Sequence, residues 1–288
     1  MSPTWRELGT RLTADLAAAG HDSPHVDARR IVEAASGRDG AEYHDALDDQ
    51  APERGVAALD RLAARRIEGE PLQYVVGRWG FRSLDLFVDP RVLIPRPETE
   101  TVAGYAMEEL DRQGVSHPTV ADLGTGSGAI ALSIARERPQ AEVWATDSSA
   151  AALDVARANL AGTGRAAARV TLVQGSWFDA LPEHLRGALD LVVSNPPYVA
   201  ADEELPPIVA DWEPLGALVA GPDGLADVEA VLLGAAFWLA PGGSVVVELA
   251  PHQAPRATGV AIEVGLVDVR VRPDLAGRDR AVIARAPS

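Results

Sequence analysis

The hydrophobic positions of the first seventy residues recur at the spacing of amphipathic helices. Thr4 and Glu7 form the pattern of a capping box where the first apolar stripe begins. Two further stripes lie within residues 24–36 and 53–68. The pattern therefore predicts a small helical bundle over residues 1–70.

Between residues 71 and 97 the pattern changes to an alternation of apolar and polar side chains. Residues 84–88 carry one alternating run, and residues 92–94 carry another beyond the Asp89-Pro90 pair. Two such runs on either side of a turn signal are typical of a β-hairpin. We interpret residues 71–97 as a β-hairpin linker whose turn lies at Asp89-Pro90.

Over residues 98–288, short apolar runs alternate with stretches of helical periodicity. The predicted strands are 119–122, 142–147, 170–174, 189–194, 244–249, 268–271 and 281–284, and the predicted helices are 98–113, 128–138, 150–160, 224–239 and 252–264. This alternation is typical of an α/β fold with a doubly wound, mostly parallel, Rossmann-like sheet of seven strands. Ligands of such sheets bind at the carboxyl ends of the strands.

Apolar segments and cysteine content bear on the compartment. The longest apolar stretch, residues 230–241, is too short to cross a bilayer and predicts a buried helix. The N-terminus lacks the basic segment and apolar core of a signal peptide. The chain has no cysteine, which fits a reducing compartment. We therefore expect a cytoplasmic protein that binds no membrane.

Net charge and residue content argue against nucleic acid and metal ions as partners. The chain has 42 acidic and 26 basic residues, which give a formal net charge of -16. A field of this sign repels a phosphate backbone, so we expect no direct contact with nucleic acid. The six histidines lie far apart and cysteine is absent, so we expect no metal site.

A glycine-rich loop follows the first predicted strand of the sheet and precedes a helix. Glycine lets the backbone turn tightly and approach a ligand closely, and a helix N-terminus favours a carboxylate or phosphate. The spacing is G-x-G-x-G, which departs from the G-x-G-x-x-G of dinucleotide folds. The loop consists of Gly124, Thr125, Gly126, Ser127 and Gly128.

The next two strands end near residues suited to a nucleoside. The Asp147 carboxylate can accept hydrogen bonds from both ribose hydroxyls, and the alternative is that it caps the helix near residue 150, which Ser148 can also do. Trp177 can pack against adenine, whereas the alternative is that Trp177 and Phe178 only fill the crevice. S-adenosylmethionine contains the carboxylate, ribose and adenine that these features suit.

The tetrapeptide Asn195-Pro196-Pro197-Tyr198 follows the apolar run 189–193. The Asn195 side-chain oxygen and the Pro196 carbonyl are two acceptors that can bind both protons of one NH2 group. Pro197 restricts the backbone, and Tyr198 adds an aromatic wall. The alternative is an ordinary proline turn that ends a buried strand.

These two motifs together resemble class I methyltransferases that act on planar NH2 groups. The stretch Leu93–Glu100 narrows the resemblance to the peptide chain release factor glutamine methyltransferases (HemK/PrmC). Further matches, in order over nearly the whole chain, are Gly69–Tyr74, Glu213-Pro214, Gly224-Leu225 and Asp274–Arg280.

The resemblance implies methyl transfer from S-adenosylmethionine to the glutamine amide in the Gly-Gly-Gln motif of class 1 release factors, which are the expected protein partners. It implies that residues 124–128 hold the donor, with Asp147 at the ribose and Trp177 at the adenine. It also implies that residues 195–198 hold the glutamine and that Asn195 contacts the donor as well. The same resemblance implies that the catalytic residues are Asn195, Pro196 and Tyr198.

Two regions depart from the family pattern. Many members carry an acidic residue where this chain has Ser176. If that residue binds the adenine amine in those members, the weaker Ser176 hydroxyl or a backbone group has to do so here. Residues 201–220 are proline-rich and peculiar to this chain. The bundle over residues 1–70 is the natural second contact surface for a protein substrate.

Two other functions fit parts of the sequence. A nucleic-acid adenine amino-methyltransferase would present the same NH2 geometry to Asn195, with the base flipped out. The charge of -16 argues against it. A noncatalytic scaffold would need neither the glycine loop nor the tetrapeptide, so the presence of both argues against that function.

Overall fold

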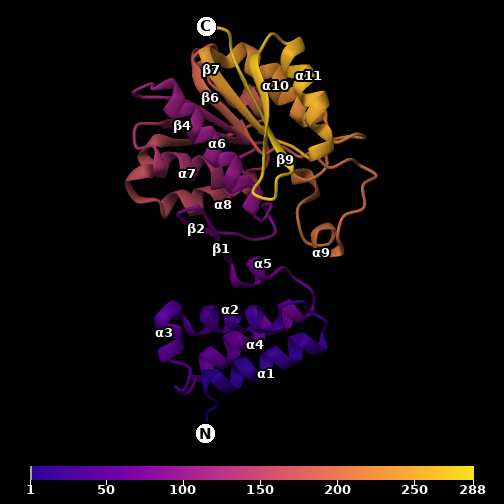
Figure 1. The fold of residues 1–288 in the computed structure, drawn as a ribbon. Coiled ribbons are helices and arrows are strands. Elements are labelled where there is room, and N and C mark those ends of the chain that lie inside the picture. Colours follow the sequence, from indigo (N-terminus) through magenta and orange to yellow (C-terminus); the bar gives the residue numbers. More distant parts are fainter. Residues whose placement is uncertain (1) are drawn as a thin grey trace. The chain divides into compact units, whose positions relative to one another are not determined.

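The computed structural model describes residues 2–288, which form two compact units (Figure 1). The first unit comprises the chain up to Arg78 together with Pro206–Trp212. The second comprises Trp79–Leu205 and Glu213–Ser288. The segment 206–212, inside the stretch that departs from the family pattern, thus belongs to the same compact unit as the N-terminal helices.

Helices make up the first unit. They are α1 (Trp5–Ala18), α2 (Pro24–Ser36), α3 (Gly40–Asp45), α4 (Glu53–Ile67), α5 (Leu72–Val76) and the short α9 (Pro207–Ala210). The predicted capping box is confirmed, because the Glu7 amide donates to Thr4 Oγ1 at 3.2 Å and the Thr4 amide donates to Glu7 Oε2 at 2.8 Å. One apolar cluster from α1, α2 and α4, which includes Leu8, Leu12 and Ile31, forms the core of this unit.

A two-stranded hairpin is present, but its predicted turn was wrong. The strands are β1 (Arg78–Phe81) and β2 (Leu84–Phe87), so the chain reverses at residues 82–83. Arg82 has a φ of 51°, as expected in a tight reversal. Beyond β2, the prolines around residues 90–97 lack amide protons, and the Ile94 amide donates to Glu213 Oε2 at 3.1 Å instead of to a strand.

The second unit contains the predicted seven-stranded sheet, in the order β5-β4-β3-β6-β7-β9-β8. All pairs are parallel except those that β9 makes with β7 and β8. The strands are β3 (Thr119–Leu123), β4 (Glu142–Asp147), β5 (Val170–Gln174), β6 (Leu189–Ser194), β7 (Leu239–Glu248), β8 (Val267–Pro273) and β9 (Asp279–Arg285). The parallel strands are near-continuous apolar runs because both faces of the sheet are covered.

Helices cover the two faces of the sheet (Figure 1). They are α6 (Pro97–Gln113), α7 (Ala129–Glu137) and α8 (Ala150–Ala161) on one face, and α10 (Ala226–Trp238) and α11 (Ala254–Glu263) on the other. Side chains of α10 and α11 share one buried cluster with Leu123 and Val192 of the central strands. Among the described residues, no helix is long and apolar enough to cross a membrane.

The apolar stretch 230–241 is not the single buried helix that was predicted. Helix α10 ends at Trp238 and β7 begins at Leu239, five residues earlier than expected. Phe237 is 64% exposed and Leu233 is 47% exposed, so one side of the helix faces water. The Pro-Gly-Gly sequence at 241–243 obscured the early start of the strand, because these residues are usually strand breakers.

The chain changes direction across the sheet between β3 and β6. From β3 the chain builds outward through β4 and β5, and it then returns to place β6 on the other side of β3. Leu123 and Ser194 are paired in the register of these strands, so the residues that follow them leave the sheet side by side. Such a switch point opens a crevice at the carboxyl ends of the strands.

Candidate active site

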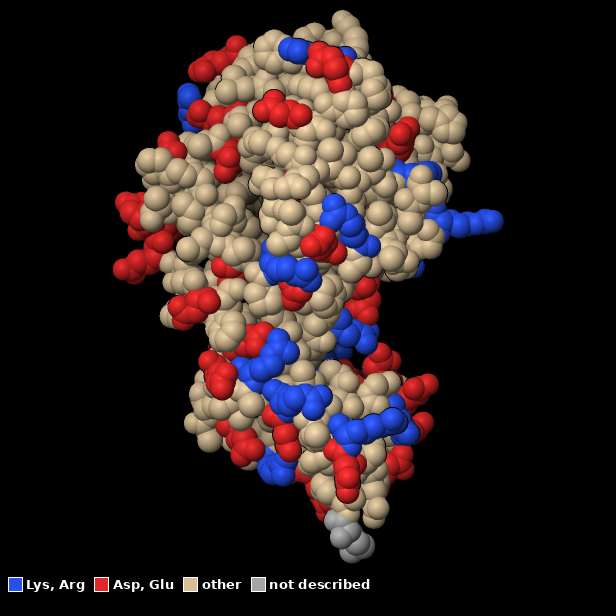
Figure 2. Space-filling view, turned by 180° about the vertical axis from the view of Figure 1, so that it is seen from behind, with Lys and Arg blue, Asp and Glu red and all other residues tan. Residues whose placement is uncertain are grey.

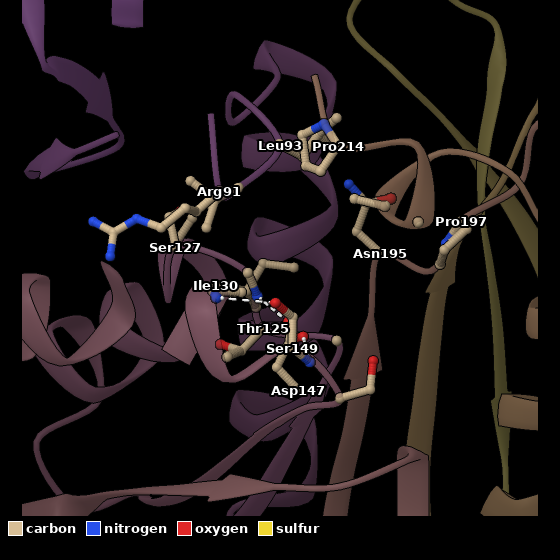
Figure 3. A pocket seen from close by; sticks show the side chains of 18 of the residues that line it. Arg91, Leu93, Thr125, Ser127, Ile130, Asp147, Ser149, Asn195, Pro197 and Pro214 are labelled. Carbon is tan, nitrogen blue, oxygen red and sulfur yellow. Dashed lines mark hydrogen bonds between the residues drawn. The ribbon is translucent and has the colours of Figure 1, made fainter. Parts of the chain in front are cut away.

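A cavity of about 430 Å³ lies at the switch point (Figure 3). Its volume falls within the roughly 300–1,000 Å³ that small-molecule sites usually have. Thr125, Asp147 and Ser149 lie on one side of the view, and Asn195 and Pro197 lie on another (Figure 3). Of the residues predicted from sequence, the lining includes Gly124, Thr125, Gly126, Ser127, Asp147, Trp177, Asn195 and Pro197.

The glycine loop has a backbone that other residues adopt only with strain. Gly124 has a φ of 72° and Gly128 has a φ of 85°, both in the left-handed region. A Cβ at Gly124 would also lie 3.4 Å from the Trp177 ring. Gly128 does not line the cavity and instead caps the N-terminus of α7. These glycines let the loop approach a ligand and enter the helix directly.

The buried carboxyl of Asp122 holds the loop from behind. Its Oδ2 accepts from Thr125 Oγ1 at 2.7 Å and from the Ala131 amide at 3.0 Å, while Oδ1 has no partner among residues 2–288. Burial raises its pKa to about 7, and the two donors only partly oppose that rise. Asp122 therefore ties the loop to the first turn of α7.

The Asp147 carboxylate faces the cavity from the end of β4. Its Oδ2 accepts from the Gly126 amide at 2.8 Å, and its Oδ1 accepts from the Ser149 amide at 2.9 Å. Burial raises its pKa, and both amides oppose the change. The N-cap of α8 is Ser149, whose hydroxyl accepts from Ala152, so neither Asp147 nor Ser148 caps that helix. Asp147 is therefore available to a ligand.

The aromatic pair after β5 separates into two roles. Trp177 lines the cavity and has an unusual φ of 43°. Phe178 is buried and stacks on Trp238 of α10, with ring centroids 5.7 Å apart. Trp177 alone thus remains at the cavity, and Phe178 fills the core.

A carboxylate that the sequence did not reveal stands beside Trp177. Asp227 of α10 lines the cavity and accepts a hydrogen bond from the Trp177 side chain. Burial raises the pKa of Asp227, and this hydrogen bond opposes the rise. Ser176 also lines the cavity. Asp227 thus supplies an acidic group to the same part of the lining as Trp177 and Ser176.

Asn195 extends into the cavity from the end of β6. Its Nδ2 donates to Thr99 Oγ1 at 3.2 Å. Among the described residues, none donates to its Oδ1, which is left to accept from a ligand. This arrangement matches the expected acceptor for an NH2 group.

The rest of the tetrapeptide does not line the cavity uniformly. Pro197 does, whereas Pro196 is buried and Tyr198 lies outside the lining. The Tyr198 hydroxyl instead donates to Glu248 Oε1 at 3.2 Å, and burial raises its pKa, so it stays protonated. The structure therefore places the tyrosine ring as support behind the loop.

A buried glutamine holds the backbone after the tetrapeptide. Gln253 Nε2 donates to the carbonyls of Tyr198 and Gly224, both at 2.9 Å. A Cβ at Gly224, where φ is 70°, would lie 2.4 Å from the Tyr198 carbonyl oxygen. The Gly224-Leu225 match noted in the sequence is thus explained by a close backbone approach.

Other matched motifs meet at the same end of the sheet. Arg96 pairs with the buried Glu213 across 117 residues of sequence. Arg278 Nη2 lies 2.8 Å from Glu98 Oε1, and its Nε lies 2.9 Å from Asp274 Oδ2. These ion pairs tie the start of α6, which carries Thr99, to the loop that holds Glu213 and to the turn between β8 and β9.

Sequence reasoning missed several residues at and behind the site, and only some left a signal. Thr99 and Gly224 stand inside stretches already matched to the family, so their positions were visible without their roles. Asp227 and Glu248 stand at the start of a helix and the end of a strand with no distinguishing neighbours. Within residues 2–288, no group of three or more His, Asp or Glu side chains is placed to hold a metal ion.

The sheet order, the glycine loop and the cavity define an S-adenosylmethionine-dependent methyltransferase of the α/β class. Residues 105–211 match the family model "Methyltransferase small domain", and residues 7–77 match "PrmC N-terminal domain". A structure of a methyltransferase from Pyrococcus furiosus has a TM-score of 0.53, with 18% identity, over 80% of this chain and 100% of that one. That likeness supports the fold.

Curated relatives narrow the class to one family. A release factor glutamine methyltransferase of Mycolicibacterium smegmatis is 43% identical over 94% of both chains. One of Xylella fastidiosa is 41% identical over 94% of this chain and 97% of its own. This chain belongs to the release factor glutamine methyltransferase family.

Proposed function

We propose that this enzyme transfers a methyl group from S-adenosylmethionine to the side-chain amide nitrogen of the glutamine in the Gly-Gly-Gln motif of class 1 release factors. The observation that carries the proposal is the position of Asn195. It extends into the same cavity as the glycine loop, with its NH2 group engaged by Thr99 and its Oδ1 open. The names of the relatives support the choice of substrate.

The part of the cavity around Asn195 and Pro197 is here called the acceptor half, because it would hold the group that accepts the methyl. It would orient a weak nucleophile. An amide nitrogen is unreactive because its lone pair is delocalised into the carbonyl. If Asn195 Oδ1 accepts one amide proton, the nitrogen is directed toward the sulfonium methyl that the donor supplies. Charge that develops on nitrogen then meets an acceptor already in place. One proton leaves to water after transfer, so no strong base is needed.

The part of the cavity around the glycine loop, Asp147, Trp177 and Asp227 is here called the donor half, because it would hold the methyl donor. It would bind the nucleoside of S-adenosylmethionine and its amino-acid part. Asp147 has acceptor capacity left for ribose hydroxyls, and the N-terminus of α7 favours the carboxylate of the donor. Trp177 would border the adenine, and Asp227 would receive the adenine amine in place of the carboxylate missing at Ser176. The cavity volume and its polar groups support this assignment.

The two compact units suggest a division of labour. We propose that residues 1–70 bind the release factor, that residues 71–97 link the units, and that residues 98–288 carry out the transfer. Hydrogen exchange on the full chain tests this, because bound release factor should protect amides of α1, α2 or α4. Unchanged exchange throughout these helices would contradict the proposal.

Surface charge favours a protein over a nucleic acid. Acidic and basic side chains are interspersed on the face drawn in Figure 2, without a continuous basic track. With a net charge of -16, the enzyme would attract a basic protein and repel DNA or RNA. We therefore propose that it contacts no nucleic acid directly, and that its translation-factor substrate places it in the cytoplasm.

Labelled donor offered with different acceptors tests the function. We expect methyl incorporation into a class 1 release factor, and none into the same factor with its Gly-Gly-Gln glutamine changed to asparagine. Adenine-containing DNA and RNA serve as further arms. Methylation of nucleic acid but not of release factor would favour the adenine methyltransferase instead.

A further inference from the structure

The carboxyl of Glu248 is buried next to the acceptor half and does not line the cavity. Glu248 ends β7 and is 0% exposed. The Tyr198 hydroxyl donates to its Oε1, and the Thr99 hydroxyl is hydrogen-bonded to the same carboxyl. Its Oε2 has no partner within residues 2–288. Acidic side chains are rarely buried so deeply without a strong partner.

Glu248, Thr99 and Asn195 form a chain of hydrogen bonds in which the ionised carboxylate fixes which group donates at each step. An ionised carboxylate only accepts hydrogen bonds, so the Thr99 hydroxyl must donate its one proton to Glu248. The lone pairs of that hydroxyl then accept from Asn195 Nδ2, which lies 3.2 Å away. Asn195 is thereby held with its NH2 group toward Thr99 and its Oδ1 toward the cavity.

We propose that Glu248 is a positioning residue that acts through Thr99 to fix which way the Asn195 amide faces. The inference rests on the proposed role of Asn195 as an acceptor for the substrate amide. If the Asn195 amide were flipped by 180°, its NH2 group would face the NH2 group of the substrate amide, and neither could accept from the other. The substrate amide would then lose the Asn195 acceptor, and its nitrogen would no longer be held in line with the methyl group.

The surroundings of Glu248 bring its ionisation close to neutral pH. Burial raises its pKa to about 7, the Thr99 hydroxyl, Arg280 and the Tyr198 hydroxyl oppose the rise, and Glu98 adds to it. These neighbours come from α6, from β9 and from the loop after β6.

Protonation of Glu248 would weaken the orientation. A neutral carboxyl can donate its own proton to Thr99, after which the Thr99 hydroxyl can donate to Asn195 and reverse the chain. The pKa is raised, so the carboxylate that holds Asn195 is lost as the pH falls through about 7. Turnover should therefore rise with pH across this range.

Two variants at Thr99 separate orientation from packing. Thr99→Val keeps the shape but removes the hydroxyl, and we expect kcat for release-factor methylation to fall by roughly tenfold or more, the usual size of a lost polar contact. Thr99→Ser keeps the hydroxyl and should retain most of the turnover. Donor affinity should differ little between the two. Equal kcat in both variants would overturn the proposal.

A pH series tests Glu248 itself. The ratio of wild-type to Glu248→Gln turnover is measured from about pH 6 to pH 8, because a ratio cancels groups common to both, such as Asp122. We expect it to rise several-fold with pH. A flat ratio would contradict the proposal, as would a Thr99→Val/Glu248→Gln enzyme much slower than Thr99→Val alone. If the wild-type enzyme methylates no release factor, the proposed function itself fails, and that result is distinct from either.

Discussion

The two halves of the cavity are built in different ways. The proposed donor half is centred on one short loop, Gly124–Gly128, and on Asp147 at the end of the next strand, with Trp177 and Asp227 added from later in the chain. The acceptor half depends on Asn195, but its orientation comes from Thr99, 96 residues earlier in the chain. A local motif can be read directly from sequence, whereas a side chain held by distant partners can be oriented only by the complete fold.

This difference predicts that damage to the acceptor half slows turnover with little effect on donor affinity. The largest effect is expected for Asn195→Ala, which removes the open Oδ1 acceptor. Turnover should fall by roughly 10²-fold or more, as for the loss of one preorganised polar contact in a transition state. Calorimetry should show donor affinity close to wild type. Near-normal methylation by this variant would remove Asn195 from the mechanism.

Damage to the donor half should have the opposite pattern. Asp147→Ala removes the carboxylate that faces the cavity, and donor affinity should weaken by about 10- to 100-fold, the size of a lost charge-assisted hydrogen bond. At saturating donor, kcat should recover most of its value. Asp154→Ala is the matched control, because Asp154 is an exposed carboxylate on α8 that pairs with Arg157. Unchanged affinity in Asp147→Ala would refute the ribose assignment.

Loss of the hydrogen bonds that hold the backbone behind the acceptor half should have an intermediate effect on turnover. Gln253 is 1% exposed and holds the carbonyls of Tyr198 and Gly224. Gln253→Ala leaves two buried carbonyls unpaired, so unfolding free energy should fall by about 1–3 kcal/mol, with several-fold slower turnover. Chemical denaturation and kinetics measure both, with the exposed Gln174→Ala as control. Loss of donor affinity without loss of turnover would break the distinction between the halves.

The smallest effect is expected at Asp227. Asp227→Asn keeps a hydrogen-bond acceptor for Trp177 but removes the charge proposed to receive the adenine amine. Donor affinity should weaken by about two- to fivefold, because a charged acceptor binds more strongly than a neutral one. Adding Ser176→Asp in the same chain should restore part of the loss. No response to either substitution would leave adenine recognition to Trp177 and backbone groups.

Much of the fold could be predicted because buried parallel strands are short apolar runs. The predicted bounds of three strands, 142–147, 170–174 and 189–194, agree with β4, β5 and β6. The start of β7 was missed because Pro241 and two glycines interrupt its apolar pattern. The hairpin turn was misplaced because alternation continues past Pro90, although the Ile94 amide bonds to Glu213.

The candidate site was predictable only where its residues carry their own local signal. Glycines before a helix and an asparagine before two prolines are such signals. Thr99 looks like any polar residue in the first turn of a charged helix, and Glu248 looks like the end of a strand. Their importance arises from pairing β6 beside β7 and from packing α6 against both strands, which no short stretch of sequence specifies.

Tandem mass spectrometry of a class 1 release factor, after reaction with wild-type enzyme and with Asn195→Ala, tests the central claim most directly. We predict one added methyl group on the side-chain nitrogen of the Gly-Gly-Gln glutamine with the wild type, and at most about a hundredth of that initial rate with the variant. A methyl group at another residue, or equal rates from both enzymes, would contradict it.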